Sequence, residues 1–188
     1  MKNIIFSILL VLISLSGYTQ TTEVLNGNKE EEFIRFDSTG LIYYKNKLYT
    51  GFYEKNHENG ELFIKGTYLN GKRNGFWEVY HDNGQLASRS SYLNGEWDGF
   101  WEVYHDNGQL FEKESYLNGE KNGVFENYHE NGQLSLKGSY LNGEETGVWE
   151  YYDQNGQLFE KGSYLNGEMN GVWEYYNKDG SLERTETH

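Results

Sequence analysis

Histidines recur in this chain at a fixed interval of 24 residues, which makes them the first candidates for metal chemistry. The column consists of His57, His81, His105 and His129, followed by Asp153 and Asn177. Zinc needs about three or four ligands that converge on one ion at about 2 Å. Residues one repeat apart lie about 10 Å from each other if each repeat supplies two strands. One ion cannot collect such a column, so we expect a polar strand end and no metal or other cofactor.

Carboxylates recur at the same interval, as at Glu78 and Glu102. General acid–base catalysis needs two carboxyl groups in one cleft with different environments, whereas every copy here offers the same surroundings. The acid before each turn, as in Asp106-Asn107-Gly108, is too isolated for calcium, which takes about six to eight oxygens. The chain has no cysteine, no Ser-His-acid pattern and no glycine-rich phosphate loop. The sequence therefore predicts no catalytic residues and no enzymatic activity.

These side chains belong to a repeat that runs without slippage from Gly51 to the end of the sequence. Two consecutive copies read GFWEVYHDNGQLASRSSYLNGEWD and GFWEVYHDNGQLFEKESYLNGEKN. A fixed period of this length is typical of arrays in which each unit packs mainly on its neighbours. Each copy has two Asn-Gly pairs, such as Asn83-Gly84 and Asn94-Gly95, and Asn-Gly between alternating residues is a strong hairpin signal. We predict an all-β fold, an elongated single-layer antiparallel β-hairpin ribbon of about six repeats and about eleven or twelve strands.

The register of the hairpins follows from the first turn. A two-residue loop at Asn83-Gly84 places Glu78 opposite Arg89, and the same arithmetic pairs a glutamate with a lysine in the other complete copies. Opposite charges across neighbouring strands are favourable. This register also sets Trp149 opposite Gly162, where the ring can cover a bare backbone. A three-residue loop with Gly84 in a bulge would lose the charge pairs, so the two-residue loop is predicted.

Period-two alternation divides the side chains between two faces. One face carries the Trp column with the Leu86 and Tyr92 columns, and the other carries the Glu–Lys rows with the Tyr80 and Leu93 columns. Rings about 10 Å apart along a flat face suit an extended peptide or a linear glycan, although packing that stabilises the ribbon explains much of the same pattern. The predicted binding residues are Trp77, Trp101, Phe125, Trp149, Trp173, Tyr92, Tyr116, Tyr140 and Tyr164.

The first residues, MKNIIFSILLVLISLSGYTQ, have a basic Lys2, an apolar run and a small or polar end. This pattern is typical of a secretory signal peptide, because the run is short for a bilayer span. We expect a secreted or periplasmic protein that has no integral membrane association after cleavage and that folds without disulfides. The net charge of -13 at pH 7 disfavours nucleic acid and anionic lipid as partners.

Residues 21–50 contain a shortened copy of the repeat. In it, Asp37-Ser-Thr-Gly40 stands where His57-Glu-Asn-Gly60 stands in the next copy. Terminal units of an array must present a solvated face, so this segment is expected to cap the ribbon. The predicted organisation is a signal peptide over 1–20, an N-terminal capping segment with a degenerate repeat over 21–50, and a repeat array with a C-terminal partial repeat over 51–188.

The string NGxxxGxWExYxxNGQLxxKGxY resembles the variant MORN repeat of bacterial proteins, a group often labelled YwqK-type antitoxins. The resemblance implies an elongated hairpin ribbon used for protein association, with an antitoxin-like or immunity-like role. The aromatic hairpins are more weakly similar to choline- and glucan-binding repeats. The predicted function is an exported, non-enzymatic protein-binding or scaffold module with a protein partner. The alternative is a carbohydrate or cell-wall-binding module that uses the Trp and Tyr face.

Overall fold

The structure is a computed structural model that describes residues 24–28 and 34–188. The predicted signal peptide over 1–20 lies outside the described residues. The N-terminal strands are β1 (Val24–Asn26), β2 (Ile34–Phe36), β3 (Ile42–Tyr44) and β4 (Lys47–Leu48). The strands of the array are β5 (Gly51–Asn56), β6 (Leu62–Leu69), β7 (Lys72–Arg73), β8 (Gly75–Tyr80), β9 (Leu86–Leu93), β10 (Glu96–Tyr104), β11 (Leu110–Leu117), β12 (Glu120–Tyr128), β13 (Leu134–Leu141), β14 (Glu144–Tyr152), β15 (Leu158–Leu165), β16 (Glu168–Tyr176) and β17 (Leu182–Thr187). No helix in these described parts is long and apolar enough to cross a membrane.

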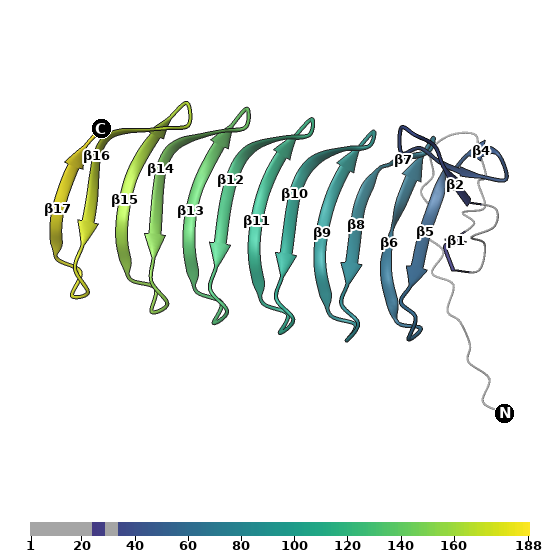
Figure 1. Ribbon diagram of the computed structural model, residues 1–188, viewed down its shortest axis with the longest axis horizontal. Coiled ribbons are helices and arrows are strands. Elements are labelled where there is room, and N and C mark those ends of the chain that lie inside the picture. The colour runs from purple at the N-terminus through teal and green to yellow at the C-terminus, as the bar shows by residue number, and fades with distance from the viewer. Residues whose placement is uncertain (1–23, 29–33) are drawn as a thin grey trace, which may run out of the picture.

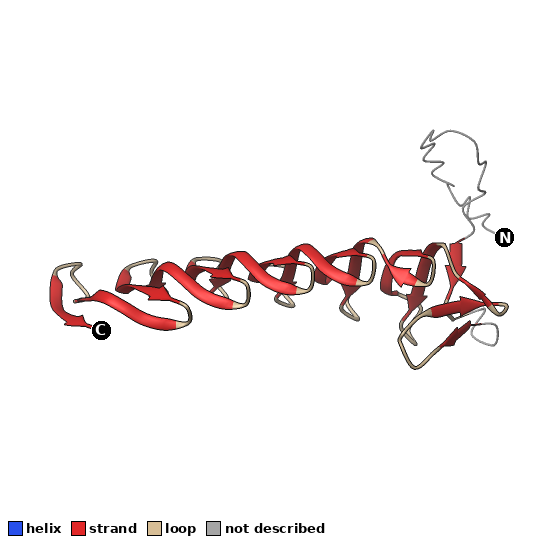
Figure 2. Cartoon of the chain, turned by 90° about the horizontal axis from the view of Figure 1, so that it is seen from above, coloured by secondary structure: helices blue, strands red, loops and turns tan. Residues whose placement is uncertain are grey.

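One sheet of 14 strands runs the length of the molecule (Figure 1). Twelve of these strands, from β5 to β17 without β7, follow one another in sequence order and pair antiparallel. β7 pairs with β6 beside this path, and β1 adds to the outer side of β5 in parallel. Seen from above, the ribbon is long and thin (Figure 2). The predicted all-β hairpin ribbon is confirmed, with the parallel β1 as an addition.

The second turn of each repeat is the predicted two-residue turn. Leu93 lies opposite Glu96, and both Asn94 and Gly95 have positive φ, at +54° and +93°, as a type I′ turn requires. The Gly95 N–H also donates to the carbonyl of Arg73 at 2.8 Å, and every later turn of this kind repeats the bond. These turns, at the top of Figure 1, are therefore tied to one another along the ribbon.

The first turn differs from its prediction. Gly84 has a φ of +81° while Asn83 stays at negative φ, and the His81 N–H donates to the Gln85 carbonyl. The loop therefore has three residues, with the glycine in the left-handed region. The charge pairs nevertheless survive, because Ala87 forms a bulge that restores the register.

The bulge also corrects one column of the predicted faces. Tyr80 pairs with Leu86, and Glu78 still pairs with Arg89 two rows further along the hairpin. Directly opposed residues share a face, so Leu86 lies with Tyr80 and the Glu–Lys rows instead of with the Trp column. A simple count from a two-residue loop cannot reveal this exchange.

A tryptophan covers the strand glycine of the preceding hairpin in three places. Trp149 is opposite Gly162 as predicted, but the ring that lies against Gly162 is Trp173 of the following hairpin, and Trp149 lies against Gly138. Trp77 lies against Gly66 in the same way. The rings therefore bridge neighbouring hairpins, and this contact fixes one repeat on the next.

The N-terminal strands pack against the first hairpins of the array. β2, β3 and β4 form a separate three-stranded sheet, and its Ile42 is buried with Leu25 and Tyr49 against Tyr53 and Trp77. The Ile42 N–H donates to the Gly71 carbonyl at 3.0 Å, and the Gly71 N–H donates to Tyr49 at 2.7 Å. This end of the array therefore has a small core of its own.

Deletion of one whole repeat, residues 99–122, should leave a shorter protein that still unfolds cooperatively. Neighbour contacts are preserved, since the strand before the deletion meets an equivalent strand after it. Deletion of 111–122 alone should prevent folding of the region, because it joins strands of the wrong direction. Circular dichroism with thermal melts of both proteins checks this expectation. Equal loss of structure in both would show that the repeats depend on distant contacts.

Candidate functional site

The Trp column does not form the exposed face that the sequence suggests. Trp77, Trp149 and Trp173 have relative exposures of 1%, 2% and 1%, and Phe125 is buried too, whereas Trp101 is half-buried. Their ring faces are occupied by the glycine backbones and by neighbouring tyrosines. The Trp column is therefore the core of the ribbon, because a sheet without a second layer can bury large rings only against its own strands and side chains.

The predicted tyrosine column supports this core from the side. Tyr92, Tyr116, Tyr140 and Tyr164 are half-buried. Tyr140 meets Trp149 edge-on with ring centroids 5.3 Å apart, and Tyr164 meets Trp173 in the same way at 5.2 Å. Such edge-to-face pairs are favourable packing arrangements. The structure thus brings the predicted site residues together, but as packing partners with little surface left for a ligand.

The opposite face carries two columns of exposed apolar side chains that sequence reasoning did not combine. One column precedes each Trp-column residue in the sequence, and the other precedes each second turn; Phe76 is 67% exposed and Leu141 55%. Phe100 is opposite Ser115, and Ser115 is two residues from Leu117, so the columns run side by side. We call these columns together the apolar stripe, which comprises Phe52, Phe76, Phe100, Val124, Val148, Val172, Leu69, Leu93, Leu117, Leu141 and Leu165.

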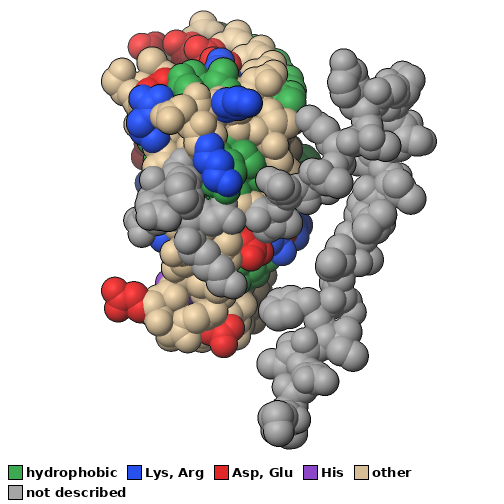
Figure 3. All heavy atoms as spheres, turned by 90° about the vertical axis from the view of Figure 1, so that its right-hand side faces the viewer, with side chains coloured by type: hydrophobic (Ala, Val, Ile, Leu, Met, Phe, Trp, Pro, Cys, Tyr) green, Lys and Arg blue, Asp and Glu red, His purple; other side chains and the backbone are tan. Residues whose placement is uncertain are grey.

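Charged side chains also lie beside the apolar stripe. At the second turns, the exposed residue that follows each turn lies directly opposite a leucine on the same face, as Glu120 lies opposite Leu117. We call these carboxylates the acidic rail, which comprises Glu96, Glu120, Glu144 and Glu168. No ion pair among the described residues includes any of the four. Figure 3, a view from the N-terminal end, shows acidic side chains at the edge that carries these turns.

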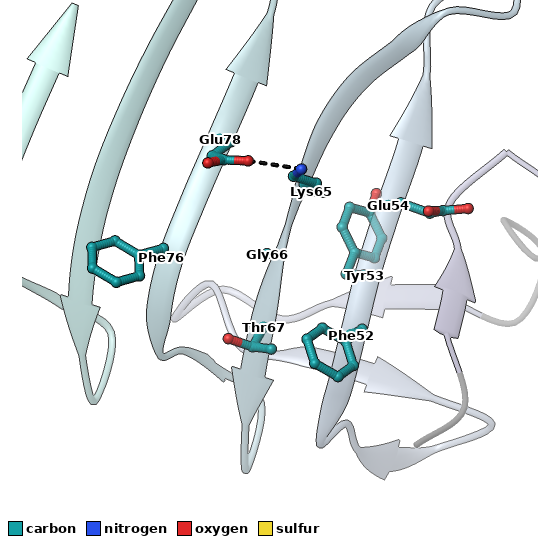
Figure 4. Close-up of a pocket in the computed structure, with 8 residues that line it drawn as sticks. All are labelled: Phe52, Tyr53, Glu54, Lys65, Gly66, Thr67, Phe76 and Glu78. Atoms are coloured by element: carbon teal, nitrogen blue, oxygen red, sulfur yellow. Dashed lines mark ion pairs between the residues drawn. The ribbon is translucent and has the colours of Figure 1, made fainter. Parts of the chain in front are cut away.

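The apolar stripe is hollowed at its N-terminal end. Phe52 and Phe76 lie on either side of Thr67, and a cavity of about 450 Å³ opens between them (Figure 4). Glu54, Lys65 and Glu78 line the same cavity, with Lys65 paired to Glu78 at 2.8 Å. The cavity therefore has apolar walls and a charged side, a combination that suits an apolar side chain of a binding partner.

The inner border of the stripe is a ladder of alternating charges. Glu78 lies between Lys65 and Arg89, at 2.8 and 3.0 Å, and accepts a hydrogen bond from Tyr80 at 2.7 Å. Burial by itself would raise the pKa of Glu78, but the bonds from Lys65, Tyr80 and Arg89 outweigh it and lower the pKa to about 2. Burial and the bond to Glu102 raise the pKa of Tyr104 to about 12. Glu78 is therefore ionised and Tyr104 neutral at neutral pH.

Replacement of Glu78 with glutamine should reduce the fall in unfolding free energy that the chain shows as the pH becomes acid. The lowered pKa means that Glu78 stabilises the fold above about pH 4.5, and that this contribution is lost as the pH falls towards 2. Because Lys65 and Arg89 are half exposed, we expect a contribution of about 1–2 kcal/mol at neutral pH. Urea unfolding at several pH values measures it.

Glu126→Gln is the matched control for that substitution. Glu126 occupies the same column and accepts a bond from Tyr128 at 2.9 Å, but no ion pair among the described residues includes it. This variant leaves the ion pairs of Glu78 in place, so the loss of stability at acid pH should remain. An identical change of profile in both variants would contradict the assignment to Glu78.

Three of the four histidines of the column, His57, His81 and His129, contact the next repeat, whereas the buried Nε2 of His105 has no hydrogen-bond partner within residues 24–28 and 34–188. The His57 ring lies 2.9 Å from the Tyr80 carbonyl, and the His129 ring lies 2.9 Å from the Tyr152 carbonyl. Asn59 Nδ2 similarly donates to the Asp82 carbonyl in the next first turn. In the part of the chain that the structure describes, no group of three or more His, Cys, Asp or Glu side chains could hold a metal ion. The contacts of His57 and His129 with the next repeat give this recurrence a structural role.

Sequence reasoning missed the apolar stripe although its signal is present. Alternation places Phe76 on the face away from Trp77, so every copy has an apolar residue opposite its core ring. The size and spacing of the tryptophans directed attention to the face whose rings are mostly buried in the structure. Only burial distinguishes the ring that packs from the ring that is exposed.

The repeat array matches a known protein family. The MORN repeat variant matches residues 73–94, 97–118, 121–142 and 145–166. No curated protein matches the chain. Among solved structures, the chain is similar to one in the crystal structure of the GtfA/B complex bound to UDP and GlcNAc, with 16% sequence identity and a TM-score of 0.27. That match covers 61% of this chain but 22% of the other, so this chain spans about a fifth of its length, and the match assigns no function here.

Proposed function

Since residues 73–166 of this chain belong to the MORN repeat variant family, we propose that it is a non-enzymatic scaffold that binds a protein partner through the apolar stripe. The observation that carries this proposal is the exposure of two adjacent apolar columns over five repeats. Exposed apolar side chains gathered on one face are typical of protein interaction sites. The family itself is a repeat-based protein-binding module, and the stripe gives that binding a location.

The charged borders of the stripe favour a protein over a glycan. Carbohydrate recognition uses exposed rings with convergent polar groups in a cleft, and three of the five tryptophan rings here, Trp77, Trp149 and Trp173, are buried. A protein interface needs an apolar centre with a polar rim, which the stripe, the acidic rail and the charge ladder provide. Export through the N-terminal leader and an immunity-like role remain parts of this proposal.

Two aspartates in the stripe should abolish partner capture without unfolding the chain. Val124 and Val148 are exposed, so Val124→Asp with Val148→Asp should leave the melting temperature nearly unchanged. A charge at the centre of an apolar interface should weaken binding by at least about 2 kcal/mol. The tagged full chain and this variant would be compared in pull-downs from envelope extract, with every captured protein retested in purified form.

Phe159→Asp provides the control. Phe159 is exposed but lies outside the stripe, at the bulge beside a first turn, so this variant should capture the same partner as the unaltered chain. A glycan array would run in parallel. Glycan binding that survives Val124→Asp with Val148→Asp, together with unchanged protein capture, would refute the proposal.

A further inference from the structure

The apolar stripe has a period that limits what can lie along it. Each repeat contributes two strands, so equivalent side chains recur about every 10 Å along the ribbon. Each repeat also presents two exposed apolar side chains side by side, for example Val124 with Leu141. A matching ligand must therefore offer two apolar side chains for each 10 Å of its length.

An amphipathic α-helix meets this requirement. One heptad of a helix rises about 10.5 Å and presents two apolar positions, a and d, along one seam. A slight tilt of the helix absorbs the difference from the repeat spacing. An extended strand presents a side chain to one face about every 6.7 Å, and a polyproline helix rises about 9.3 Å per turn but presents a single side chain per turn to one face.

The acidic rail specifies the charge of this helix. Glu96, Glu120, Glu144 and Glu168 lie directly opposite the leucines of the stripe, and no described ion pair neutralises them. At the preceding repeat Lys72 takes this position, so the rail begins at Glu96. A partner helix with lysine or arginine beside its apolar seam would complement it.

A second copy of the chain fits this surface less well. Its net charge is -13, so stacking one stripe on another would oppose two acidic surfaces. Moreover, the described residues of this chain contain no helix. The occupant must therefore be a different chain with basic character.

We infer that the apolar stripe docks a basic amphipathic α-helix of a partner protein along the repeats from Leu93 to Leu165, with one heptad per 24-residue repeat. The inference rests on the proposed function, because it specifies the partner of the same surface. The apolar seam of the helix contacts the Leu and Phe/Val columns, and its basic flank contacts the acidic rail. The helix is recognised by its period and its charge, so its exact sequence can vary.

The test uses synthetic peptides of about 28 residues, or four heptads, with the full chain. The probe has leucine at a and d and lysine at e and g, where repulsion between lysines keeps the free peptide from self-association. One control peptide has the same composition in scrambled order, and a second has proline-rich triplet spacing with the same charge. Fluorescence anisotropy gives the affinity, and circular dichroism gives the helix gained on binding.

We expect the heptad peptide to gain helix and to bind at least tenfold more tightly than either control. Leu117→Ser with Leu141→Ser should weaken binding at least tenfold, and Glu120→Lys with Glu144→Lys should weaken it to a similar degree at low salt. The matched controls off the stripe, Phe159→Ser and Glu130→Lys, should bind as the unaltered chain does. Thermal melts would confirm that all variants remain folded.

Equal binding of the scrambled peptide would overturn the inference, because composition alone would then explain the affinity. Tighter binding of the proline-rich peptide would overturn it in favour of a polyproline ligand. These outcomes are separate from failure of the proposed function. Protein capture that depends on Val124 and Val148 while the heptad peptide fails to bind would leave the stripe a protein interface and exclude only the helix.

Discussion

Replacement of Lys121 with methionine should be among the most damaging single substitutions in the array, costing about 3–5 kcal/mol of unfolding free energy. Lys121 forms an ion pair with Glu114, whose side chain is only 3% exposed. Tyr116 donates a second hydrogen bond to the same carboxylate at 2.5 Å. Removal of the ammonium group would leave a buried carboxylate without its cation, which costs more than the ion pair contributes.

A comparison with a lysine whose carboxylate partner is more exposed separates this effect from general charge loss. The Lys121 and Lys137 side chains are similarly exposed, at 37% and 46%, but Glu150, which pairs with Lys137 at 2.6 Å, is 20% exposed against 3% for Glu114. Lys137→Met should therefore cost under about 1 kcal/mol. Glu114→Gln combined with Lys121→Met should recover most of the lost stability, because the amide carries no charge. Urea unfolding gives the unfolding free energies of the unaltered chain, of Lys121→Met, of Lys137→Met and of the double variant. Equal costs for Lys121→Met and Lys137→Met would refute this account.

Replacement of Gly138 with alanine should cost about 3 kcal/mol, at the upper end of the usual range for overpacking. A methyl group at Gly138 would overlap the indole ring of Trp149. The ring is 2% exposed and meets Phe125 on one side and Tyr140 on another, so it has no free space to move into.

A smaller ring should relieve this overlap. The chain itself provides a partial precedent at Glu114, which occupies the glycine position of its repeat: the next strand places Phe125 opposite it, while Trp101 lies opposite it on the preceding strand. Gly138→Ala with Trp149→Phe should therefore lose less stability than the sum of the two single substitutions. Ser139→Ala, one residue along the same strand, is the control and should change the free energy by under about 0.5 kcal/mol. Additive losses in the double variant would contradict the packing argument.

Several features of the fold could be predicted from the sequence because they depend on local chemistry. Asn94-Gly95 specifies a two-residue turn, since both residues must adopt positive φ. The pairing of Glu78 with Arg89 follows from opposite charges at matched distances from a turn. The 24-residue period then extends each local solution along the ribbon, which is why the architecture was predictable.

The first turn shows where local reasoning stops. Asn83-Gly84 and Asn94-Gly95 have the same two residues, yet one belongs to a three-residue loop and the other to a two-residue loop. A longer loop followed by the Ala87 bulge preserves the same pairing of Glu78 with Arg89. Two combinations of loop and bulge are therefore equivalent for the charges, and the pattern of residues cannot distinguish them.

The assignment of the two faces was decided only by the tertiary structure. Alternation separates Phe76 from Trp77, but it does not state which of two aromatic faces becomes buried in a sheet without a second layer. That choice depends on neighbouring hairpins: Trp77 is buried because Gly66 of the preceding strand leaves space for its ring. The sequence by itself determined the strands of the array, their order and the second turn of each repeat, because these follow from short-range chemistry. Which face packs depends on contacts between repeats, so it emerges only when the hairpins lie side by side.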